Sequence, residues 1–144
     1  MRHLRHLRHL LALLFLLLAM PAHAADEAVI EGIQEYMEFT SYGDGALSSA
    51  QLRDAGLDSF FIVDARTADR YDAGHIQGAI NIEWRQILAH VDELPTDRAI
   101  LLYCDTGLLS AKAQFALRIA GFEKANVLQG GYPAWVAENA SASK

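Results

Sequence analysis

Two short apolar runs constrain the fold of this chain more than any other feature. They extend from Phe60 to Val63 and from Ala99 to Cys104, and neither shows the polar alternation of a half-exposed strand. Continuous runs of this length are typical of strands that are buried on both faces. Segments with helical character follow at residues 67–73, 84–94 and 110–121. Strands that alternate with helices predict an α/β domain with a parallel sheet.

The first 24 residues have the layout of a secretory signal peptide. Three arginines precede an apolar run from Leu10 to Met20, and small residues follow around a cleavage point after Ala24. The apolar run is shorter than the roughly 20 residues that a membrane span requires. We therefore expect a secreted protein, which is periplasmic if the source is a Gram-negative bacterium.

The rest of the chain divides into an extension, one domain and a tail. Residues 25–46 form a helical extension, in which Ile30, Ile33 and Met37 recur at helical spacing between acidic residues. Residues 47–138 are long enough for one domain and too short for two. Residues 139–144 are a small polar tail.

Charge limits the partners. Without residues 1–24, nine basic side chains stand against eighteen acidic ones, a formal net charge of −9. Such a surface does not suit nucleic acid or anionic lipid. We therefore expect no nucleic-acid partner and no membrane contact after cleavage of the leader. Separately, we expect a monomer or a weak oligomer.

The single cysteine lies where chemistry is expected. Cys104 ends a buried strand, and a short loop leads from it into a helix that we expect to begin near Ser110. Loop amides and a helix N-terminus that face one point form a site for an anion, which favours a thiolate. The alternative is that Cys104 is an inert core residue, a common role for a free cysteine.

Four motifs in order resemble those of the rhodanese family of sulfurtransferases. They are LSSAQL at residues 47–52, VDARTADRYDAGHIQGAINI at 63–82, LLYCDTGLLSAKAQFALRIAGF at 101–122 and VLQGGYPAW at 127–135. The resemblance implies a rhodanese-like fold, with a parallel sheet of about five strands and helices on both faces.

The resemblance also implies an activity. In this family a cysteine takes a sulfane sulfur from a donor such as thiosulfate, an organic persulfide or a thiosulfonate, and passes it to cyanide or a thiol. Cys104 would be the nucleophile, and the residues that follow would cradle the sulfur and bind the substrate: Asp105, Thr106, Gly107, Leu108, Leu109 and Ser110. No metal or organic cofactor is implied.

One position departs from the family pattern. Many active members have an arginine at the fifth residue after the cysteine, where this chain has Leu109. A leucine cannot give an oxyanion the paired hydrogen bonds of a guanidinium. The departure favours an organic persulfide, a small thiol or a protein thiol over thiosulfate, and Arg70 is the candidate substitute for the missing arginine.

Two further side chains have both a structural and a functional interpretation. Arg66 either binds substrate or pairs with groups that fix the loops at the sheet edge. His75 either acts as a general base or shapes its loop by bonding to the backbone.

The sequence also bears on three other functions. A phosphatase of the related fold requires an arginine at position 110, which is serine. A non-catalytic binding module agrees with the missing arginine, although inactive relatives commonly replace the cysteine. A redox partner protein would need a thiol from another molecule, because this chain has no second cysteine.

Overall fold

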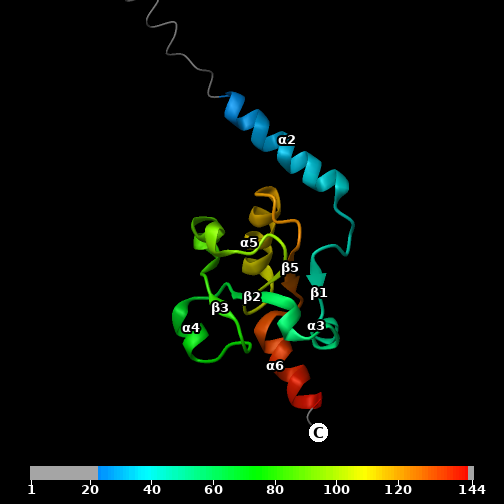
Figure 1. The fold of residues 1–144 in the computed structure, drawn as a ribbon, viewed down its shortest axis with the longest axis vertical. Coiled ribbons are helices and arrows are strands. Elements are labelled where there is room, and N and C mark those ends of the chain that lie inside the picture. Colours follow the sequence, from blue (N-terminus) through cyan, green and yellow to red (C-terminus); the bar gives the residue numbers. More distant parts are fainter. Residues whose placement is uncertain (1–22, 143–144) are drawn as a thin grey trace, which may run out of the picture. The chain divides into compact units, whose positions relative to one another are not determined.

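The computed structural model describes residues 23–142, which fall into two units that divide between Glu38 and Phe39. The first unit contains helix α2, His23–Phe39, except for its last residue (Figure 1). The predicted signal peptide therefore lies largely outside the described residues. Among residues 23–142, no helix is both long enough and apolar enough to cross a bilayer.

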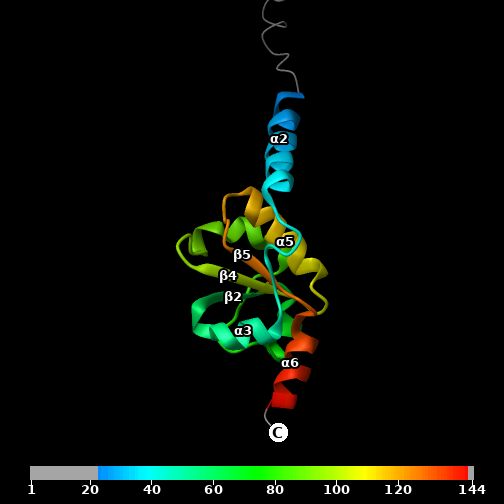
Figure 2. The same ribbon diagram turned by 90° about the vertical axis from the view of Figure 1, so that its right-hand side faces the viewer.

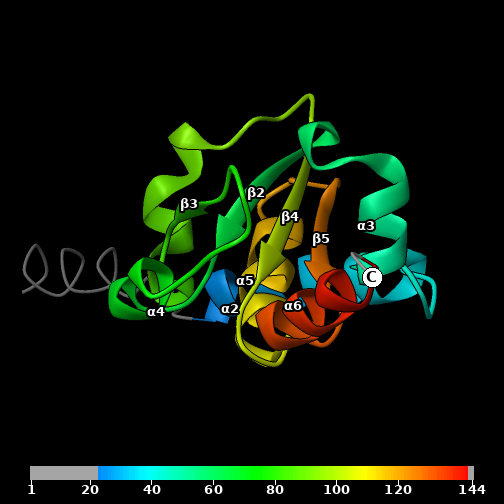
Figure 3. The ribbon, with the colours of Figure 1, turned by 90° about the horizontal axis from the view of Figure 1, so that it is seen from below.

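The second unit is built on a five-stranded parallel sheet. Its strand order is β1-β5-β4-β2-β3, and Figure 3 shows β3, β2, β4 and β5 side by side. All four pairings are parallel, as the alternation of strands and helices predicts. The strands are β1 (Ala46–Leu47), β2 (Phe60–Asp64), β3 (Ile80–Asn81), β4 (Ala99–Tyr103) and β5 (Ala125–Leu128).

Helices cover both faces of this sheet, which confirms the predicted fold class. Figure 2 shows α5 on one side of the strands and α3 and α6 on the other. The two α-helices of the second face are α3, Ser49–Ala55, and α6, Gly131–Ala142, while α5 spans Leu108–Ile119. The shorter elements are the 3₁₀ turn η1 (Leu57–Ser59), helix α4 (Ala68–Asp72) and the 3₁₀ segment η2 (Trp84–Glu93).

Neighbouring residues of the central strands β2 and β4 pack into two separate hydrophobic cores. Val63 and Leu102 pack with α5 and η2, whereas Ile62 and Leu101 pack with α3 and α6. All four side chains are at most 3% exposed. Burial of a side chain of this size stabilises the fold by about 1.5–3 kcal/mol, so the apolar runs are explained by two-sided packing.

Local signals set several element ends. The Ser48 side chain accepts from the Gln51 N–H and the Gln51 side chain accepts from the Ser48 N–H, a capping box that starts α3. Gly56 ends the helix with φ of +79°, in the left-handed region that favours glycine.

The sequence-based boundaries were wrong in three places. Strand β1 was not predicted, because two residues carry no periodicity, and it brings Ala46 into the sheet by pairing with Val127. The segment expected as one helix at 84–94 is a 3₁₀ segment, with non-helical angles at His90. Helix α5 begins at Leu108 rather than near Ser110, because Gly107 turns the chain with φ of +93°.

Candidate active site

The carboxyl ends of β2 and β4 lie side by side and carry the residues of the candidate site. Asp64 is paired in register with Tyr103, and Cys104 follows directly. Cys104 is 1% exposed. In open parallel sheets, ligands usually bind at the carboxyl ends of the strands, which is the edge where these polar groups lie.

The loop after Cys104 turns hydrogen-bond donors toward its sulfur. The N–H of Gly107 donates to Sγ at 3.2 Å, and the Ser110 hydroxyl lies 3.6 Å from Sγ. Ser110 is fully buried, and its hydroxyl oxygen also lies 3.0 Å from the Gly107 carbonyl oxygen, so its single proton has two acceptors within reach. The site therefore combines a nucleophilic atom with a preformed cradle for negative charge.

These donors lower the pKa of the Cys104 thiol from its ordinary value. Burial by itself raises this pKa, but the N–H and the hydroxyl of Ser110, with the N–H groups of Thr106 and Leu109, stabilise the thiolate and outweigh it. A lowered thiol pKa is typical of a reactive cysteine rather than an inert one.

The first residues of α6, Gly131 and Tyr132, contact the backbone of the cysteine loop. The Tyr132 N–H, in the first turn of α6, donates to the Cys104 carbonyl oxygen at 2.8 Å. Gly131 has φ of +63°, and a Cβ atom there would collide with this oxygen and lie 2.7 Å from the Asp105 carbonyl carbon. The close approach of the two backbones therefore requires glycine at position 131.

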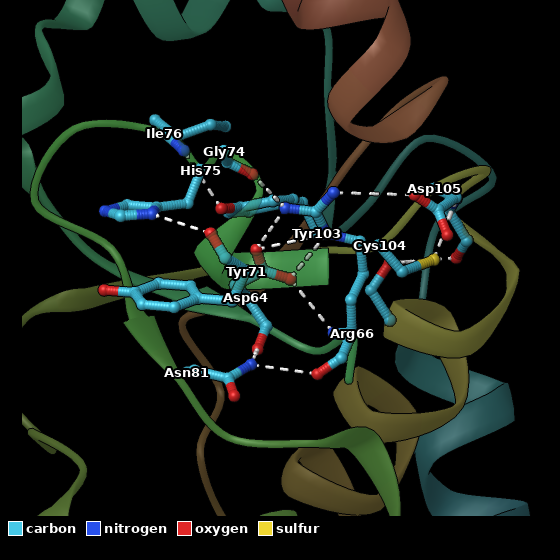
Figure 4. A network of polar contacts seen from close by, with 12 residues as sticks. Asp64, Arg66, Tyr71, Gly74, His75, Ile76, Asn81, Tyr103, Cys104 and Asp105 are labelled. Carbon is cyan, nitrogen blue, oxygen red and sulfur yellow. Dashed lines mark hydrogen bonds and ion pairs between the residues drawn. The ribbon is translucent and has the colours of Figure 1, made fainter. Parts of the chain in front are cut away.

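Arg66 is a buried side chain with most of its donors occupied. Its Nε donates to both oxygens of Asp64, at 2.9 and 3.1 Å, and one terminal nitrogen donates to the Gly74 carbonyl oxygen at 2.7 Å. Figure 4 shows the guanidinium between Asp64 and Asp105. The Tyr132 ring centroid lies 4.3 Å from the guanidinium carbon. These contacts explain the position of the Arg66 side chain by a structural role alone.

The remaining predicted site residues are exposed. Thr106 is exposed, and its hydroxyl oxygen accepts from the Leu108 N–H at 3.4 Å. Leu108 is 71% exposed and Leu109 is 38% exposed, both in the first turn of α5. Arg70 lies exposed on α4, and the described contacts of the cysteine loop do not include it.

His75 takes the arrangement of a loop-shaping residue. Its Nδ1 lies 3.0 Å from the Tyr71 carbonyl oxygen, and its ring stacks on that of Tyr71 with centroids 3.9 Å apart. The Tyr71 hydroxyl in turn donates to the Ala79 carbonyl oxygen. Within residues 23–142, no group of three His, Cys, Asp or Glu side chains is placed to hold a metal ion.

Sequence reasoning missed two contributors to the site, Gly131 and Tyr132. Both belong to the motif VLQGGYPAW, but a motif alone does not say which backbone it approaches. Two consecutive glycines at the end of a strand were the available signal, because glycine permits close backbone contact.

Comparison with known proteins gives consistent matches. A family model described as rhodanese-like domain matches residues 48–138. YqhL, an uncharacterized protein of Bacillus subtilis, is 33% identical over 81 residues, which are 56% of this chain and 64% of YqhL. The chain thus spans less than two thirds of that relative. The thiosulfate sulfurtransferase GlpE of Shewanella oneidensis is 33% identical over 79 residues, 55% of this chain and 78% of GlpE.

Solved structures agree with the family match. The crystal structure of the Alr3790 protein from Anabaena has a TM-score of 0.59 and 30% identity to this chain, and the match covers 64% of this chain and 75% of that one. The family model covers more than half of the sequence, and it includes the whole cysteine loop and most of the sheet. The chain therefore belongs to the rhodanese-like domain family.

Proposed function

We propose that this protein is a rhodanese-type sulfurtransferase that carries sulfur as a persulfide on Cys104. The observation that carries the proposal is the thiol itself, buried at the end of β4 with the Gly107 N–H and the Ser110 hydroxyl directed at its sulfur. Similarity to GlpE, a thiosulfate sulfurtransferase, supports a general sulfurtransferase role for this protein.

The chemistry runs in two steps. The Cys104 thiolate attacks the outer sulfur of the donor, a sulfur–sulfur bond forms to Cys104, and the bond between the outer sulfur and the rest of the donor breaks. The rest of the donor leaves with the electron pair of the broken bond. A thiol or cyanide then attacks the outer persulfide sulfur, and the Cys104 thiolate leaves. A nucleophile that forms a covalent intermediate in this way divides one difficult transfer into two easier ones.

The loop is suited to both steps. Negative charge lies on sulfur before the attack, on the terminal sulfur of the persulfide, and again on Cys104 after transfer. N–H groups that are already oriented stabilise that charge without reorganisation during the reaction. The substrates are a small sulfur donor and a thiol or cyanide acceptor, and a protein thiol is included among the acceptors.

The decisive experiment is a mass measurement on the intact protein. After incubation with thiosulfate, an aromatic thiosulfonate or an organic persulfide, the protein should gain the mass of one sulfur atom and lose it on addition of cyanide. Cys104 is the only cysteine in the chain, so Cys104→Ser should gain nothing. If the unmodified protein never gains this mass with any donor, the sulfurtransferase proposal fails.

A non-catalytic binding role is the second candidate. The observation that favours it is the pair Leu108 and Leu109, whose side chains are exposed beside the cysteine loop. The same mass measurement separates the two candidates, because a binding module has no need to form a persulfide.

Export of the protein is proposed on the composition of residues 1–24. Expression of the full chain in a Gram-negative host, followed by fractionation and N-terminal sequencing, tests it. A periplasmic product that begins at Ala25 supports the proposal, and a cytoplasmic product with an intact N-terminus contradicts it.

A further inference from the structure

The positive charge of Arg66 is not available to an incoming donor. The side chain of Arg66 is only 5% exposed, and its Nε and one terminal nitrogen are occupied by Asp64 and the Gly74 carbonyl oxygen. The other terminal nitrogen lies 3.6 Å from Oδ1 of Asp105. Figure 4 shows this second carboxylate next to Cys104, on the residue that follows the nucleophile.

The Asp105 carboxylate, rather than the Arg66 guanidinium, is therefore the charged group that an incoming donor approaches. Two carboxylates surround one guanidinium, so the cluster carries a net negative charge. The Asp105 side chain is 45% exposed, against 5% for Arg66. The loop amides that could attract an anion are directed at the cysteine sulfur itself.

The side chains that follow Asp105 do not offset this charge. Leu108 and Leu109 present apolar surface in the first turn of α5. Of the polar contacts described for residues 104–110, the only one that involves a cationic side chain is that with Arg66. The surroundings of the nucleophile thus combine one partly exposed negative charge with apolar side chains.

We propose that Asp105, held in place by Arg66, determines donor specificity by selecting against doubly charged donors and favouring donors with one charge and an apolar group. The proposal rests on the sulfurtransferase function above. Thiosulfate and benzenethiosulfonate test it as a pair. Attack of the Cys104 thiolate on the outer sulfur yields the same persulfide from both, and it releases sulfite from the first and benzenesulfinate from the second.

The expected effect follows from one unit of charge. An additional negative charge at about 6 Å from a partly exposed carboxylate lowers the rate constant of association and attack roughly 5-fold at low salt. Asp105→Asn keeps the shape of the side chain and removes its charge. It should raise kcat/KM for both donors, and by about 5-fold more for thiosulfate than for benzenethiosulfonate.

A matched control and a test without mutation accompany this variant. Asp54→Asn removes the same charge from an exposed position on α3, and it should leave the ratio of the two kcat/KM values unchanged. In the unmodified protein, higher ionic strength should shift the ratio toward thiosulfate, because salt screens the exposed carboxylate. This second measurement holds even if Asp105→Asn folds poorly.

The outcomes separate the two proposals. If both donors form the persulfide but neither Asp105→Asn nor salt changes their ratio, Asp105 does not determine specificity, and the sulfurtransferase function stands. If neither donor forms a persulfide in any variant, the sulfurtransferase function fails, and the specificity proposal fails with it.

Discussion

Replacement of Gly131 by alanine tests whether the glycine turn at the start of α6 holds the cysteine loop in place. The alanine Cβ would collide with the Cys104 carbonyl oxygen and lie 2.7 and 2.8 Å from the carbonyl carbon and oxygen of Asp105. All these atoms are backbone, so neither side can yield by changing a rotamer. The Cys104–Asp105 peptide and the turn must therefore move apart.

The magnitude has two parts. The φ of Gly131 is +63°, and a residue with a Cβ in this left-handed region lowers the free energy of unfolding by about 1–2 kcal/mol. Overpacking of a tight contact costs about 1–3 kcal/mol more. We therefore expect Gly131→Ala to lower the free energy of unfolding by about 2–5 kcal/mol, together with loss of the hydrogen bond from the Tyr132 N–H.

Gly78 provides a matched control. Its φ is +80°, and a Cβ there would meet no atom within 4 Å. Gly78→Ala should therefore show the backbone cost of about 1–2 kcal/mol alone. Urea denaturation of both variants measures the difference, which isolates the collision with the cysteine loop.

Activity gives the second readout. A displacement of about 1 Å in a catalytic group is enough to lower a rate roughly 100-fold, so Gly131→Ala should form the persulfide far more slowly than Gly78→Ala under conditions where both are folded. Equal stability and equal persulfide formation in the two variants would refute the assignment of Gly131 as a support of the loop.

Three further predictions concern single side chains around the loop. Iodoacetamide alkylates the thiolate, so the lowered pKa of Cys104 should keep alkylation fast at pH values where an ordinary thiol is protonated. Ser110→Ala should move the midpoint of this pH profile upward. An unmoved midpoint would show that the Ser110 hydroxyl does not stabilise the thiolate. Leu109→Arg should increase kcat/KM for thiosulfate, because a guanidinium donates paired hydrogen bonds to an oxyanion; an unchanged or smaller value would show that Leu109 does not limit this donor. Asp64→Asn should lower the free energy of unfolding by about 3–5 kcal/mol, because it leaves the charge of buried Arg66 without its main partner. A loss below about 1 kcal/mol, as for an exposed ion pair, would contradict the role of Asp64 as the partner of a buried charge.

The apolar runs made the central part of the fold predictable. Ile62 and Val63 are adjacent and both buried, on opposite faces of the sheet. An uninterrupted run is what two-sided burial requires, and the helices on both faces follow from it. The edge strand β1 left no such signal, because its two residues are held by pairing with β5 rather than by a pattern of their own.

The position of the candidate cysteine was predictable, and the details of its loop were not. Cys104 ends a buried strand, and parallel sheets place function at that edge. The start of α5 depends on the left-handed conformation of Gly107, and a glycine in the sequence permits this conformation without requiring it. For this reason Leu108 and Leu109 were expected in a loop but lie in the first helical turn.

The structural account of Arg66 depended on contacts from distant parts of the chain. Asp64 lies two residues away and could be named from the sequence, whereas Gly74, Tyr132 and Asp105 come from three other segments. Only the folded chain brings them together around one guanidinium.

The same packing links the stability of the site to its charge. Burial of Arg66 is tolerable because carboxylates and a carbonyl oxygen surround it, and one of those carboxylates, Asp105, directly follows Cys104. A change at Asp105 that alters donor preference therefore also removes part of the pairing of a buried cation. Donor selectivity and unfolding free energy should be measured on the same variants, because a gain in thiosulfate use at Asp105 is expected to come with some loss of stability.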